Sequence, residues 1–144
     1  MKVVTFLFCL VVAAALARVT ARADDAQILP ADQPTTVNGV EVACTGVGDE
    51  ANTDPRWPAY AVRIEFANAH AEYLSDIDIT VSDAKGEVLF TLRCASPWFL
   101  AKLPPGKYTV AGTFEDRLTK TAKFTAPAQG QARIIVRYPE VAGD

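Results

Sequence analysis

The chain has 144 residues, 50% of them hydrophobic, and a formal net charge of −3 at pH 7. This length accommodates one domain with its own hydrophobic core. The mild excess of acidic residues and the lack of a basic stripe argue against nucleic acid and anionic membranes as partners.

Residues 1–23 have the layout of a secretory signal peptide. Met1-Lys2 provides a positive start, residues 3–16 form an apolar run, and Ala21-Arg22-Ala23 places small residues at both positions of an A-x-A cleavage site. The apolar run is shorter than the roughly 20 residues that a bilayer requires, so we expect no membrane span. We expect cleavage after Ala23 and a periplasmic or secreted protein.

Two cysteines, Cys44 and Cys94, remain after this cleavage. An even number of cysteines in an exported chain favours a disulfide. Each of the two alternates with apolar residues along its segment, which predicts that both thiols point into the core. A redox-active pair is the alternative, but the C-x-x-C spacing of such pairs is missing. We therefore expect a structural disulfide between Cys44 and Cys94.

Short strands separated by turns follow one another along the rest of the chain. Residues 24–37 are polar and contain prolines, so we expect a flexible N-terminal arm there. Beyond it, apolar residues alternate with polar ones in the manner of half-buried strands. The predicted strands cover residues 40–44, 60–66, 77–82, 87–94, 98–102, 108–114, 117–124 and 134–138.

Seven or eight such strands predict an all-β, antiparallel Greek-key sandwich. It forms a single domain over residues 38–139, followed by a short tail at 140–144. In the strand at 60–66, the alternation places Tyr60 and Ile64 on the apolar face and directs Arg63 and Glu65 toward water.

Three blocks of sequence carry a family resemblance. They are residues 71–86, which end in Asp83-Ala84-Lys85-Gly86, residues 97–110, which contain Leu103-Pro104-Pro105-Gly106-Lys107-Tyr108, and residues 46–50. Together they resemble small exported bacterial proteins with a carboxypeptidase regulatory-like domain, which is similar to the transthyretin-like β-sandwich attached to some metallocarboxypeptidases. The resemblance covers about residues 38–139. It implies a stand-alone module of seven or eight strands without the catalytic domain.

The loop from Gly46 to Pro58 is the first candidate for a functional site. It has about 13 residues, whereas typical connections have about 4–6, and long loops are often functional. One interpretation is a calcium site made by Asp49, Glu50 and Asp54, although their spacing differs from that of an EF-hand. A second is a structural corner in which Asp49 and Glu50 cap a short helical turn. A third is a contact with a partner, for which Trp57, expected to be exposed, is the natural anchor.

Other chemically interesting residues have simpler interpretations. His70 is the only histidine, and we expect it in a solvated turn, because zinc sites and acid–base dyads need further ligands or partners. Asp76 and Asp78 are expected on one face of a strand, where they indicate a solvent-facing surface rather than a glycosidase pair. Trp98 is expected to pack in the core.

We therefore expect an exported, non-enzymatic β-sandwich that binds another protein or an envelope glycan, with Asp49, Glu50 and Trp57 as contacts. The alternative is a carbohydrate-binding module in which Trp57, Trp98 and Tyr73 form an aromatic platform. A hydrolase is a weaker third hypothesis, since no Ser/His/Asp set is recognisable. We predict no catalytic residue, no metal ligand and no cofactor.

Overall fold

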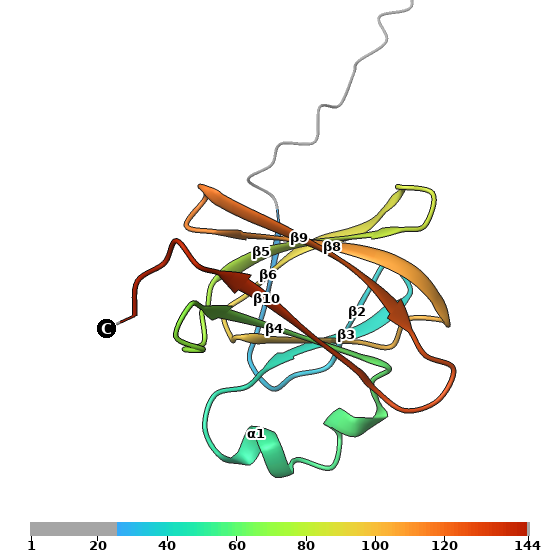
Figure 1. Ribbon diagram of the computed structural model, residues 1–144. Coiled ribbons are helices and arrows are strands. Elements are labelled where there is room, and N and C mark those ends of the chain that lie inside the picture. Colours follow the sequence, from blue (N-terminus) through green and yellow to red (C-terminus); the bar gives the residue numbers. More distant parts are fainter. Residues whose placement is uncertain (1–25, 144) are drawn as a thin grey trace, which may run out of the picture.

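The structure is a computed structural model that describes residues 26–143 (Figure 1). The expected signal peptide lies outside the described residues. Two five-stranded β-sheets pack face to face as a sandwich. This confirms the predicted all-β sandwich.

The first sheet has the order β1 (Gln27–Leu29), β6 (Val88–Cys94), β5 (Ile77–Asp83), β8 (Gly106–Phe114), β9 (Leu118–Ala126). The second sheet has the order β10 (Ala132–Tyr138), β4 (Val62–Asn68), β7 (Trp98–Ala101), β3 (Val40–Thr45), β2 (Thr35–Val37). Two short helices, α1 (Glu50–Thr53) and η2 (Trp57–Ala59), lie between β3 and β4. In Figure 1, α1 lies on the side of the second sheet that faces away from the first.

Each of the eight predicted strands matches one of the strands from β3 to β10, with ends that agree within two residues. The segment at 24–37, which was expected to be a flexible arm, contains β1 and β2, so two parts of it are paired with the sheets. The sandwich is also not purely antiparallel, since β1 pairs in parallel with β6 and β10 in parallel with β4. The short strands β1 and β2 carry no alternating pattern of their own and gain their conformation from the sheet edges on which they pair.

The main core lies between the two sheets and consists of the inward residues of the alternating strands. The largest contributions come from Phe66, Ile77, Ile79, Leu92, Phe99 and Tyr138. Gly112 in β8 provides space for Tyr138. A Cβ there would lie 2.5 Å from the tyrosine hydroxyl, which instead donates a hydrogen bond to the Gly112 carbonyl at 2.7 Å. This contact fixes β10 of the second sheet against β8 of the first.

A disulfide joins the two sheets. Cys44 in β3 and Cys94 in β6 are bonded to each other, and both are fully buried. This confirms that the two thiols point into the core from opposite sheets.

In the part of the chain that the structure describes, no helix has the length and apolar character needed to cross a membrane.

Candidate functional site

The 46–58 loop covers part of the outer face of the second sheet. Ala43 in β3 and Leu100 in β7 point away from the main core and pack with Trp57 and Tyr60 in a separate apolar cluster. Trp57 is only 4% exposed. The expectation that Trp57 is exposed was therefore wrong, because η2 folds its indole back onto the sheet.

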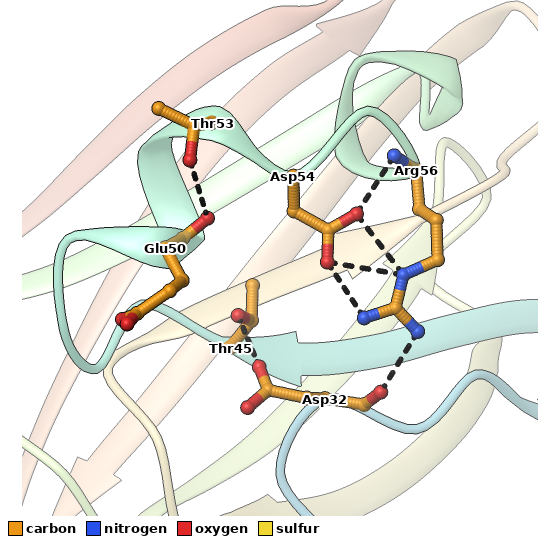
Figure 2. Close-up of polar contacts among 6 residues, drawn as sticks. All are labelled: Asp32, Thr45, Glu50, Thr53, Asp54 and Arg56. Carbon is orange, nitrogen blue, oxygen red and sulfur yellow. Dashed lines mark hydrogen bonds and ion pairs between the residues drawn. The ribbon is translucent and has the colours of Figure 1, made fainter.

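Polar contacts hold this loop against the strands (Figure 2). The Arg56 guanidinium donates from Nε and Nη2 to the Asp54 carboxylate, at 3.0 and 2.6 Å, and from Nη1 to the Asp32 carbonyl at 3.1 Å. The hydroxyl of Thr45, at the end of β3, donates to Asp32 Oδ1 at 2.6 Å. Arg56 thereby links the loop to the segment between β1 and β2. The hydrogen bonds from Arg56 also lower the pKa of the Asp54 carboxyl.

The far end of the loop is held by Gln131, which lies just before β10. Its side-chain amide donates to the carbonyls of Trp57 and Tyr60, at 2.8 and 3.0 Å. The Arg56 guanidinium also stacks over the Trp57 ring at 4.3 Å. The loop is thus held to the segment at Asp32, to Gln131 and, through Trp57, to the outer face of the second sheet, which limits the conformations available to it.

The residues at the tip of the loop stay at the surface. Asp49 occupies the N-cap position of α1 but makes no side-chain capping hydrogen bond, and the Glu50 side chain is also exposed. The short helical turn was predicted correctly. The calcium interpretation loses one of its three ligands, because Asp54 is engaged by Arg56. Within residues 26–143, no group of three or more His, Cys, Asp or Glu side chains is placed to hold a metal ion.

Gly46 allows the loop to leave β3 across the indole of Trp98. Its φ is +104°, and a Cβ there would lie 2.5 Å from Trp98 Cγ. We expect Gly46→Ala to lower the free energy of unfolding by about 1–3 kcal/mol, since it adds both a clash and an unfavourable φ. Urea unfolding measures this change. Gly39→Ala is the matched control, because it has a positive φ but no atom within 4 Å of the added Cβ. Equal losses in the two variants would contradict the clash.

Next to the loop, the outer face of the second sheet contains a buried carboxylate. Glu65 in β4 is 1% exposed, although the sequence predicted that it faces water. From β10, Arg133 donates to both of its oxygens, at 2.6 and 2.8 Å, while Arg63 forms an ion pair with it at 2.6 Å. Burial favours a higher pKa for Glu65, but the Arg133 hydrogen bonds and the charges of both arginines outweigh it and hold the pKa below its usual value.

Aromatic rings complete this network. The Arg63 guanidinium lies 3.4 Å from the centroid of the Trp98 ring, and Tyr73 contacts the same indole edge-on. The Tyr73 hydroxyl donates to Glu65 at 3.3 Å. Trp98 is 2% exposed, so the prediction that it packs in a core is confirmed, although it lies on the outer side of β7. No local sequence pattern predicts this network, because its members come from four separate segments.

The predicted aromatic platform for a sugar is not formed. Trp57 and Trp98 are both buried, which leaves Tyr73, at 46% exposure, as the one exposed ring of the three. Sugar-binding platforms present an aromatic face to solvent. A carbohydrate site built on these three residues is therefore contradicted.

The remaining candidates lie far from the loop. His70 is exposed in the turn after β4, as expected, and its backbone N–H donates to Asn68 Oδ1 at 2.9 Å. Asp76 precedes β5 with φ +59°, so it does not share a strand face with Asp78 as expected. Asp78 instead accepts two hydrogen bonds at 2.7 Å from Arg93 on the neighbouring strand β6.

No protein-family model matches this chain, and no curated protein matches it either. The resemblance found in the three sequence blocks therefore stays a prediction.

Proposed function

We propose that this protein is an exported, non-enzymatic β-sandwich module that binds another protein or a component of the cell envelope through its 46–58 loop. The observation that supports this most directly is the anchoring of the loop. A long connection that is held by Arg56, by the buried Trp57 and by Gln131 has fewer conformations available than a free loop of the same length. Because the loop is already ordered, little conformational entropy is lost when a partner binds.

The exposed side chains at the tip of the 46–58 loop are suited to contact with a partner. Val47 is 65% exposed, and Asp49 and Glu50 beside it are exposed carboxylates that form no ion pair with any residue of the described part of the chain. An apolar side chain next to two unpaired carboxylates suits a partner surface that offers an apolar patch with basic groups around it. Trp57 supports this surface from beneath and is not itself a contact.

The proposal also includes the export of the protein and its membership of a family. The disulfide between the sheets is compatible with an extracellular location, since such bonds persist in oxidising compartments. We further infer that β3 to β10 correspond to the eight-strand Greek-key core of a carboxypeptidase regulatory-like domain, with β1 and β2 as additions at the edges.

The test compares three forms of the protein as bait on an envelope fraction: the wild type, Asp49→Asn/Glu50→Gln and the control Asp76→Asn/Glu87→Gln. The control also removes two exposed carboxylates that form no ion pair in residues 26–143. We expect a component that the wild type and the control retain and that the loop variant retains about tenfold less, because two interface charges are lost. Quantitative mass spectrometry and glycan analysis of the eluates measure this.

Equal retention by all three forms would contradict the role of the loop. Thermal unfolding of the loop variant should match that of the wild type, since neither carboxylate forms a hydrogen bond or an ion pair within residues 26–143. A lowered midpoint would mean that these side chains serve stability instead.

A further inference from the structure

A groove of about 440 Å³ opens on the first sheet, beside the hairpin between β5 and β6. Side chains of β8 and β9 form its floor. Lys107 pairs with Thr125 across these strands, and Thr109 pairs with Lys123. These four residues alternate with the inward residues Tyr108 and Phe124, so they lie on the outer face of the sheet. Tyr108 and Phe124, which pair with each other between them, also line the groove. The hairpin residues Asp83, Ala84 and Gly86 form the wall.

Three lysines that form no ion pair in residues 26–143 lie in or beside the groove. Of the five lysines in the described part of the chain, Lys102 and Lys120 form ion pairs with glutamates, and the other three form none. Lys107 and Lys123 line the groove, and Lys85 is an exposed residue of the hairpin between the lining residues Ala84 and Gly86, beside the groove. A chain with a net charge of −3 thus gathers three unpaired cations at one place.

The one carboxylate that lines the groove is already engaged. Asp83 Oδ1 accepts hydrogen bonds from the backbone N–H groups of Lys85 and Glu87, at 2.8 and 3.0 Å, and so shapes the hairpin. Lys107 and Lys123 are diagonal neighbours, and their Cα atoms are about 7–8 Å apart. Like charges on neighbouring side chains repel each other, and an anion placed between the two ammonium groups would remove the repulsion and contact both.

Hydroxyl groups extend from the groove across the sheet. The outer face of β5, β6, β8 and β9 carries Thr80, Ser82, Thr91, Thr109, Thr113, Thr119, Thr121 and Thr125. Two pairs of these hydroxyls bond to each other across strands, Thr113 with Thr119 at 2.8 Å and Thr80 with Thr91 at 3.1 Å. Hydroxyls both donate and accept, which matches the hydroxyls of sugars. The outward positions of β8 and β9 carry no aromatic ring on which nucleic acid bases would stack.

We propose that this groove binds an acidic polysaccharide, with carboxylate or phosphate groups of the chain between Lys85, Lys107 and Lys123. Thr109 and Thr125 bond to neighbouring sugar hydroxyls. The site lies on the sheet opposite to the 46–58 loop, so it is independent of the partner contact proposed above.

Isothermal titration calorimetry tests the proposal with six probes. Polygalacturonate carries carboxylates, and its methyl-esterified form has the same backbone without charge. Dextran phosphate and dextran form the corresponding pair for phosphate, while inorganic phosphate and polyglutamate carry the charge without a sugar. We expect binding to at least one of the two charged polysaccharides, no binding to the neutral forms, and weaker binding as the salt concentration rises.

Two variants and one matched control locate the site. Lys107→Gln/Lys123→Gln should lower the affinity for the charged polysaccharide about tenfold, since two charge contacts are lost. Lys102→Gln/Lys120→Gln removes the same charge elsewhere and should leave the affinity within about twofold. Thr109→Val/Thr125→Val keeps the charge and the shape, and should also weaken binding by about tenfold through two lost hydrogen bonds. The side chains changed in all three variants are at least partly exposed. We therefore expect circular dichroism to show an intact fold for each of them.

Three results would overturn the proposal. The first is no binding to either charged polysaccharide, and the second is binding that both lysine variants weaken equally. The third is a combined result: polyglutamate binds as tightly as the polysaccharide, and Thr109→Val/Thr125→Val does not change the affinity. This result would mean that the groove binds an acidic protein segment. The loop variant Asp49→Asn/Glu50→Gln should bind the polysaccharide with the affinity of the wild type. The groove proposal and the loop proposal can therefore fail independently of each other.

Discussion

Glu65→Ala should lower the free energy of unfolding by about 3 kcal/mol. Glu65 is fully enclosed, and its removal leaves Arg63, whose side chain is 19% exposed, stacked on Trp98 without a counter-charge. An arginine in such a place has lost most of its solvation, and the Trp98 ring alone does not replace the lost carboxylate. Arg133 is more exposed, so its loss of a partner contributes less. Urea unfolding of the variant measures the change.

Arg117→Ala is the control for this prediction, because it breaks an ion pair with Glu115 in which both side chains are exposed. Pairs of this kind contribute at most about 1 kcal/mol. A similar loss in both variants would mean that the burial of Glu65 has no energetic consequence.

The lowered pKa of Glu65 also predicts that the free energy of unfolding depends on pH. The pKa of Glu65 is lower in the folded state than in the unfolded chain, where it is about 4.3. The stability that this group contributes is therefore complete above that value and is lost as the pH falls through the lowered pKa. We expect the free energy of unfolding of the wild type to decrease more steeply below about pH 4 than that of Glu65→Gln. Equal slopes would contradict the lowered pKa.

Removal of the disulfide by Cys44→Ala/Cys94→Ala should cost about 4 kcal/mol. The two cysteines are 50 residues apart in sequence, so the bond greatly restricts the unfolded chain. In the folded state it also ties β3 of the second sheet to β6 of the first. Urea unfolding under oxidising conditions measures the loss.

Reduction of the wild type provides an independent check on the disulfide. The reduced wild type and the double variant should agree within about 1 kcal/mol, because both lose the same restriction on the unfolded chain. Their circular dichroism should still show a β-sandwich, since the apolar core between the sheets is otherwise unchanged. A reduced protein as stable as the oxidised one would contradict this role of the bond.

The candidate site was predictable only in part. The length of the 46–58 loop and its short helical turn follow from local sequence, as do the surface positions of Asp49 and Glu50. The burial of Trp57 does not, because it depends on Ala43 and Leu100, which lie on strands on either side of the loop in sequence. The lysine groove was missed for the same reason. Lys85, Lys107 and Lys123 are separated by about 20 residues in sequence, and only the order of β5, β8 and β9 brings them together.

The positions of the eight strands from β3 to β10 and the inward direction of both cysteines could be predicted from the sequence alone. These features depend on alternation with a period of two residues, which is a local property of the chain. Three other features depend on how the strands pack: which outer faces are covered, the parallel pairing of β10 with β4, and the burial of Glu65. The alternation around Glu65 is the same as in a strand whose polar face meets water. Its burial depends on Arg133 and Tyr73, and contacts between distant segments leave no periodic signal in the sequence.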